Sequence, residues 1–209
     1  MKNPYSIVSA LEDAVCEYTG APFCVAVNSC TMAILLSLVW WKRKWNSDNA
    51  KVPLNYVSIP KHTYISVPMS IRHAGFNYVH FRDENWLGSY QLKPLPIWDS
   101  AREFSSDMYT PGQFICVSFH ATKILADTQG GAILLDDPVA AQWLKRARFD
   151  GRTEGVAPKD DDFFELGWHC YLSVDVAARL LHKIMVLPKC NDPLPNDQYP
   201  DLSRLELFR

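Results

Sequence analysis

Short apolar runs that alternate with segments of helical apolar spacing constrain the fold of this 209-residue chain more than any other feature. Apolar residues that recur once per helical turn predict helices, and short apolar runs bounded by turn residues predict buried strands. Helices are therefore expected over residues 6–20, 32–45, 137–149 and 173–187, and strands over residues 23–27, 56–60, 78–81, 96–99, 114–119 and 131–136. This alternation is typical of α/β domains with a mostly parallel sheet.

Composition and charge limit the classes of partner. Hydrophobic residues make up 48% of the chain and charged residues 21%, as in ordinary soluble globular proteins. The formal net charge is −2, so neither a nucleic-acid polymer nor an anionic membrane is an expected partner. The most apolar helical segment, MAILLSLVWW, is too short to span a bilayer.

The six cysteines are scattered along the chain. They form no C-x-x-C pair and show no zinc spacing, so no metal site is expected. No signal peptide is recognisable at the N-terminus, which favours a cytoplasmic protein with free thiols.

Four loops that follow expected strands hold the candidate functional residues. In parallel α/β sheets, ligands bind beyond the carboxyl ends of the strands. The loops at these positions are NSCT (28–31), PKHTY (60–64), DSAR (99–102) and SFHATK (118–123).

Each of these residues also has a purely structural explanation. The helix start at Ser29 could bind a phosphate, or Ser29 could simply cap the helix. Asp99 could pair with a cationic ring nitrogen of a ligand, or it could cap the segment that begins at Ser100. Lys123 could be a nucleophile of lowered pKa, although a solvated loop lysine is the commoner case. A phosphate cradle, a carboxylate, an aromatic platform and an imine-forming lysine together fit pyridoxal phosphate.

The order of these segments resembles that of the DegT/DnrJ/EryC1/StrS sugar aminotransferases, which are fold-type I pyridoxal-phosphate enzymes. EYTGAPFCVAVNSCTMAILLSL is similar to the family's YTGA…AVNSGTAAL, and WDSAREF is similar to EDAAQAL. VSFHATKILADTQGGAILLDD is similar to FSFHATKNLTTGEGGAVVTDD. The matching motifs occur in family order over roughly residues 10–180. The resemblance implies a three-layer α/β/α large domain.

The resemblance also implies roles for individual residues. Lys123 would be the catalytic Schiff-base lysine and would later carry the proton. Asp99 would pair with the pyridine nitrogen. The remaining cofactor contacts would come from Ser118, Thr31 and the backbone of Cys30 at the phosphate, Tyr64 on the ring, Arg102 near the phenolic oxygen, and His169 at the phosphate of a partner subunit.

Several positions depart from the family pattern. Arg102 replaces a Gln or His, Cys30 replaces a glycine, His169 replaces an asparagine, and Tyr171 replaces an arginine. A family segment that includes a sheet strand is missing near residues 84–94, so this chain or another chain must close the gap. The small domain is also largely absent. We therefore expect a shortened large domain over residues 1–187. The tail, 188–209, would stand in place of the small domain and either wrap the surface or dock through Leu202, Leu205 and Phe208.

The function implied by the resemblance is transfer of an amino group from an amino acid, expected to be glutamate, to a keto nucleotide-sugar. A second interpretation keeps the cofactor but changes the reaction to decarboxylation, elimination or amine transfer on a modified nucleotide. A third is a non-catalytic, truncated partner of a full-length aminotransferase. The presence of Lys123, Asp99 and Ser118 together argues against the third. Because family members are dimers with sites at the interface, a homodimer with shared sites is expected.

Overall fold

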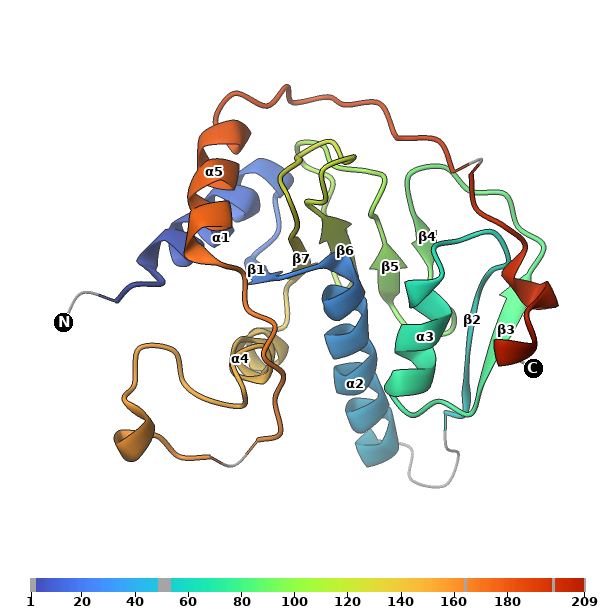
Figure 1. Cartoon of the computed structure of the whole chain (residues 1–209), viewed down its shortest axis with the longest axis horizontal. Coiled ribbons are helices and arrows are strands. Elements are labelled where there is room, and N and C mark those ends of the chain that lie inside the picture. The colour runs from blue at the N-terminus through green and yellow to red at the C-terminus, as the bar shows by residue number, and fades with distance from the viewer. Residues whose placement is uncertain (1–2, 49–53, 164, 197, 209) are drawn as a thin grey trace.

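The computed structural model describes residues 3–48, 54–163, 165–196 and 198–208 (Figure 1). Its helices are α1 (Ser6–Thr19), α2 (Cys30–Asp48), α3 (Ser66–His73), α4 (Pro138–Ala147) and α5 (Val174–Ile184). Its strands are β1 (Phe23–Val27), β2 (Tyr56–Pro60), β3 (Tyr78–Arg82), β4 (Tyr90–Gln91), β5 (Ile97–Asp99), β6 (Phe114–Ser118) and β7 (Gly131–Leu135). Short 3-10 helices cover Pro158–Asp160, Leu202–Arg204 and Glu206–Phe208. The α/β class is as the sequence predicts.

The main sheet is mixed rather than mostly parallel, which corrects the sequence prediction. Its strand order is β1-β7-β6-β5-β4, and only β5 and β6 pair in parallel within it. β2 and β3 form a separate parallel pair. The prediction rested on helices between strands, but the chain passes from β6 to β7 and from β4 to β5 without a helix, and such short returns give antiparallel pairs.

The strand directions still collect the loops that the sequence singles out. β7 is antiparallel to both β1 and β6, so β1 and β6 run the same way, and β5 runs with them. The carboxyl ends of β1, β5 and β6 therefore lie at one edge of the sheet. Asp99 and Ser118 are the last residues of β5 and β6, and Ser29 follows the end of β1.

The segment near residues 84–94, where the sequence predicts a gap in the sheet, connects the two sheets. Tyr90 and Gln91 of β4 pair with β5 on one side. On the other side Lys93 exchanges two backbone hydrogen bonds with Ser58 of β2, at 2.7 and 3.0 Å. The segment between β3 and β5 thus joins the two sheets, and in Figure 1 β4 lies between β5 and β2.

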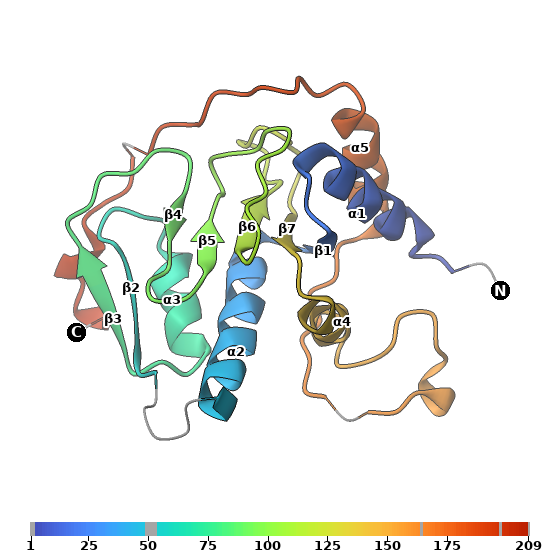
Figure 2. The same cartoon turned by 180° about the vertical axis from the view of Figure 1, so that it is seen from behind.

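Two buried apolar clusters lie on opposite faces of the main sheet. Ile133 and Leu135 of β7 belong to the cluster that contains residues of α2, α3 and α4. Leu134, which points to the other face, belongs to the cluster that contains residues of α1 and α5. Figure 2 shows α1 and α5 packed together on this second side.

The C-terminal strap, residues 188–208, arches from the end of α5 over the sheet edge to β3, as both views show (Figures 1 and 2). It docks through Leu202, which is buried, and through the ring of Phe208, which lies 5.9 Å from that of Phe81. Leu205 remains exposed. Within the described ranges, no helix combines the length and apolar character that crossing a membrane would require.

Candidate functional site

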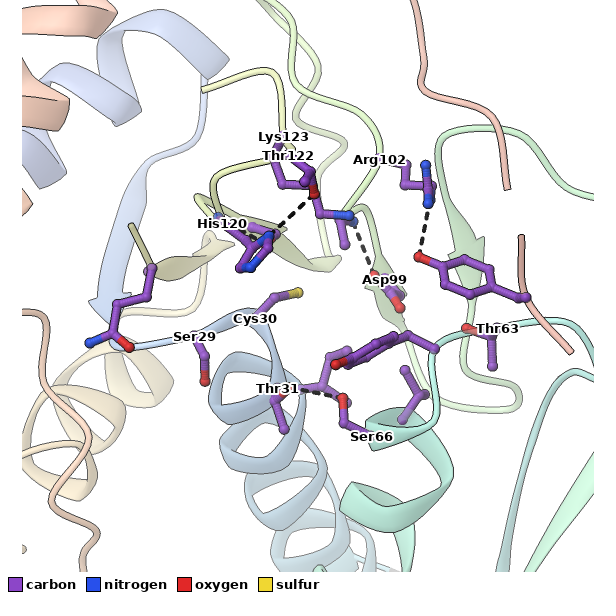
Figure 3. Close-up of a pocket in the computed structure, with 18 of the residues that line it drawn as sticks. Ser29, Cys30, Thr31, Thr63, Ser66, Asp99, Arg102, His120, Thr122 and Lys123 are labelled. Carbon is purple, nitrogen blue, oxygen red and sulfur yellow. Dashed lines mark hydrogen bonds between the residues drawn. The ribbon is translucent and has the colours of Figure 1, made fainter. Parts of the chain in front are cut away.

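A cavity of about 410 Å³ lies at the sheet edge where β1, β5 and β6 end. Seven of the eight predicted site residues line it: Cys30, Thr31, Tyr64, Asp99, Arg102, Ser118 and Lys123. They come from the start of α2, the loop after β2, the last residues of β5 and β6, and the loops that follow these two strands. Figure 3 shows five of them, Cys30, Thr31, Asp99, Arg102 and Lys123, around the cavity. Residues far apart in the sequence therefore meet in one place.

His169 does not line this cavity. Its Nδ1 atom lies 2.8 Å from the Asp150 carboxylate, and 71% of its side-chain surface is exposed. The prediction that His169 contacts the phosphate in a partner's site stays a prediction, and an exposed side chain is available for such a contact.

The start of α2 supplies backbone donors to the cavity floor. Ser29 Oγ accepts a hydrogen bond from the N–H of Met32 at 3.2 Å, so the capping role weighed for Ser29 is confirmed. The first N–H groups of a helix have no acceptor within the helix, and the helix dipole makes this end positive. The Thr31 hydroxyl lies 2.8 Å from that of Ser66, at the start of α3. A helix start with these properties favours the binding of an anion.

Gly131 allows β7 to approach this turn closely. A Cβ atom at this position would lie 2.5 Å from the backbone nitrogen of Cys30 and 2.8 Å from the carbonyl oxygen of Val117. Any side chain would push the start of α2 away from the ends of β6 and β7. The close packing keeps the helix start and Ser118 beside the same cavity.

Asp99 is a buried carboxylate with two hydrogen-bond donors. The Tyr90 hydroxyl donates to Oδ2 at 2.7 Å, and the N–H of Ala101 donates to Oδ1 at 3.0 Å. Thr63 in turn hydrogen-bonds the Tyr90 hydroxyl. Burial raises the pKa of Asp99, and the Tyr90 and Ala101 hydrogen bonds and the nearby Lys123 oppose that rise. A cationic group bound in the cavity would compensate the buried charge.

Sequence analysis did not identify Tyr90. The segment around it shows neither strand alternation nor a motif, because its strand is only two residues long. Tyr90 belongs to β4, which pairs with β5. The same short segment therefore extends the sheet and supplies a hydrogen bond to Asp99.

Lys123 lies in the loop between β6 and β7, and its backbone N–H donates to the carbonyl of His120 at 2.9 Å. Burial lowers the pKa of Lys123, and the positive charge of Arg102 lowers it further, while Asp99 opposes both. A lysine with a lowered pKa has a larger neutral fraction, and the neutral amine is the nucleophile. Lys123 therefore differs from a solvated loop lysine, because it is partly buried and lines the cavity.

Arg102 and two aromatic residues form the wall opposite Lys123. The Nε of Arg102 donates to the Tyr199 hydroxyl at 3.0 Å, and its guanidinium lies 4.9 Å from the centre of that ring. Trp86 lies against Tyr199 with an interplanar angle of 16°. Neither aromatic residue was predicted, because no pattern links the C-terminal tail to the loop after β3.

Comparison with known proteins gives a family match over most of the chain. The sequence profile described as the DegT/DnrJ/EryC1/StrS aminotransferase family matches residues 1–85 and 107–189. The stretch 86–106 and the end of the chain from residue 190 lie outside this match. No curated protein sequence matches the chain.

Several solved structures share the fold. AtS13 from Actinomadura melliaura superposes with a TM-score of 0.71 at 18% identity, covering 87% of this chain and 60% of that one. The sugar aminotransferase CalS13 from Micromonospora echinospora gives 0.69 at 19% identity, with coverages of 87% and 60%. Helicobacter pylori PseC, an aminotransferase involved in the biosynthesis of pseudoaminic acid, gives 0.69 at 15%, with 90% and 64%. The chain therefore spans about three fifths of the length of these structures, and the likeness establishes the fold.

Proposed function

The chain belongs to the DegT/DnrJ/EryC1/StrS aminotransferase family, and from this membership we propose that it is a pyridoxal-phosphate-dependent aminotransferase. It would move an amino group from an amino acid, with glutamate as the expected donor, to the keto carbon of a nucleotide-linked sugar. The observation that carries the proposal is the meeting of Lys123, Asp99 and the start of α2 in one cavity.

The donor set of the cavity fits pyridoxal phosphate. The cofactor has a phosphate, a ring nitrogen that is basic and an aldehyde, and each of these has a counterpart. The start of α2, with Thr31 and Ser118, provides donors for a phosphate. Asp99 provides a buried negative charge for a protonated nitrogen, and Lys123 provides an amine of lowered pKa. Tyr64 lies at the cavity mouth, where its ring can stack on a planar ligand.

When bound, pyridoxal phosphate supplies an aldehyde that takes up amino groups and a ring that withdraws electrons from the bonds of the attached carbon. Lys123 would hold the cofactor covalently through its Nζ. The Nζ of Lys123, whose pKa is lowered by burial and by Arg102, would take the proton from the donor's α-carbon. Asp99 would hold a proton at the ring nitrogen throughout, and Tyr90 would keep the Asp99 carboxylate in place.

We assign the cofactor-binding part to residues 1–187 and the role of a reduced small domain to the tail, 188–209. We also propose a homodimer in which His169 of one subunit completes the phosphate site of the other. The exposed His169 side chain, which does not line its own subunit's cavity, supports this arrangement.

The amino-donor half of the reaction can be tested alone. The protein loaded with pyridoxal phosphate is mixed with L-glutamate, and the near-visible absorbance of the lysine-bound cofactor is followed together with the formation of 2-oxoglutarate. We expect one equivalent of 2-oxoglutarate per site as the band is lost. Carbon dioxide release would instead identify a decarboxylase. A band that is unaffected by every amino acid would contradict the proposal.

A further inference from the structure

The two segments that lie outside the family match meet each other at the cavity. One contributes Trp86 and Arg102, and the other, the C-terminal strap, contributes Tyr199. All three residues line the cavity beside Lys123. These three residues form one wall of the cavity, built where the strap crosses the loops after β3 and β5 (Figure 1).

The strap is fixed on both sides of Tyr199. On one side the N–H of Leu194 donates to the carbonyl of Arg102 at 2.8 Å. On the other side the N–H of Leu202 donates to the carbonyl of Lys61 at 2.9 Å. The Tyr199 carbonyl lies 3.0 Å from Nδ1 of His62. Backbone contacts on both sides give the Tyr199 ring a defined position over the cavity.

Tyr199 in turn fixes the direction of the Arg102 guanidinium. Its hydroxyl accepts the hydrogen bond from Nε, and its ring lies under the guanidinium. Trp86 stacks with the Tyr199 ring, and its own Nε1 donates to the His62 carbonyl at 2.9 Å. With Nε engaged, the two terminal nitrogens of Arg102 remain, and within the described parts of the chain neither has a hydrogen-bond acceptor.

An arginine end with two free parallel N–H groups matches one kind of ligand especially well. A carboxylate accepts two parallel hydrogen bonds from such an end, whereas a lysine would offer a single point charge. Arg102 is also close enough to Lys123 for the two positive charges to repel, so an anion between them is favoured. The phosphate donors at the start of α2 come from a different element of the cavity.

We propose that Arg102, oriented by Tyr199 of the C-terminal strap, binds the α-carboxylate of the amino donor. This inference rests on the proposed aminotransferase function. Tyr199 is then a positioning residue, which acts only through Arg102. The strap would thus take over part of the role of a small domain, because its Tyr199 completes the binding site for the amino donor.

The test compares Tyr199→Phe, Arg102→Lys and Arg102→Gln with Tyr78→Phe, a matched control. Tyr78 is an exposed tyrosine of β3 that does not line the cavity. The first readout is the affinity for glutarate, a dicarboxylate without an amino group, measured by calorimetry on the protein with and without pyridoxal phosphate. The second is the half-reaction with L-glutamate compared with 4-aminobutyrate, which lacks the α-carboxylate.

We expect Arg102→Gln to weaken glutarate binding by about tenfold or more, as loss of a charged hydrogen-bond donor does. Arg102→Lys should be intermediate, because it keeps the charge and loses the planar end. Tyr199→Phe should weaken binding about three- to tenfold. In the half-reaction both Arg102→Gln and Tyr199→Phe should raise the apparent KM for L-glutamate by a larger factor than that for 4-aminobutyrate, and so reduce discrimination between the two. Tyr78→Phe should match the wild type.

The inference is overturned if glutarate fails to bind the wild-type protein, or if it binds all variants equally. It is also overturned if Tyr199→Phe lowers reaction with both amines to the same extent, since that would indicate a general structural role. The proposed function can fail separately: a wild type that never retains pyridoxal phosphate at Lys123 would refute it. The glutarate affinities would still decide whether Arg102 and Tyr199 form a carboxylate site.

Discussion

Lys123 and Asp99 illustrate how burial at the end of a strand changes the chemistry of an ordinary side chain. Burial favours the neutral form of each group, lowering the pKa of Lys123 and raising that of Asp99. Each partly restores the charged form of the other. The site therefore suits a ligand that carries a phosphate and a cationic nitrogen. Burying the charge of Lys123 or of Asp99 without a partner would cost free energy.

The pH dependence of stability follows from the raised pKa of Asp99. Since the folded protein without cofactor holds the Asp99 proton more tightly than the unfolded chain, ionisation at this site lowers stability as pH rises above about 4. We expect Asp99→Asn to remove that loss, so the variant without cofactor should be as stable as the wild type or more stable at pH 8. Thermal melting at pH 4 and pH 8 measures the difference.

The same variant should lose activity, because an amide cannot hold a proton at the ring nitrogen. We expect the half-reaction with the amino donor to slow by roughly 100-fold or more. If Asp99→Asn lowers the melting temperature of the cofactor-free protein at both pH values, and the loss of activity follows this loss of folded protein, Asp99 is a structural capping residue and its proposed role is wrong.

At the level of elements, the sequence predicts the helices and strands that have a regular apolar pattern, and it does not reveal the short ones. The strands expected at 23–27 and 56–60 match β1 and β2, and Asp137 caps α4 through the N–H groups of Val139 and Ala140. α3 was missed because it is only eight residues long and contains Pro68. β4 was missed because two residues cannot show alternation.

The site was predictable to the same degree. Residues at or after the ends of strands, such as Asp99 and Lys123, could be found from spacing and from the family resemblance. Tyr90 and Tyr199 could not, since both depend on contacts between segments that have no periodic pattern. The mixed strand pairing was also hidden, because alternation does not reveal where the chain returns without a helix.

The closure of the sheet gap by β4 and Lys93 can be tested by amide hydrogen exchange. The amides of Ser58 and Lys93 donate to each other's carbonyls, so both should exchange slowly, and equally slowly at low and high protein concentration. The amide of Asn85, an exposed residue outside any strand, is the control. If protection at Ser58 appears only at high concentration, a second chain fills the gap instead.

At the scale of the whole molecule, the central question is how about three fifths of the length of its structural neighbours could support a complete site. Two short segments of the chain contribute to the sheet and to the site. A two-residue strand, β4, extends the main sheet beyond β5, and a strap without regular strands brings Tyr199 to the cavity. What a single subunit does not bring to its own cavity is His169, the residue that we propose for the partner's site.

Mixing two inactive variants tests whether sites are shared between subunits. Lys123→Ala lacks the lysine of its own site, and His169→Ala lacks the residue proposed to reach the partner's site. In a mixed dimer one of the two sites has both residues, so remixing equal amounts should restore about a quarter of the wild-type activity. Activity that stays at the level of the unmixed variants would contradict a shared site.

The most direct test of the account is to find where the protein holds pyridoxal phosphate. The purified protein is incubated with the cofactor and reduced with borohydride, and the modified peptide is identified by mass spectrometry. We predict one modification per chain, located at Lys123 and at no other lysine. The modification should be absent from Lys123→Ala, and that variant should remain folded. Modification spread over exposed lysines, or unchanged labelling of Lys123→Ala, would contradict the account.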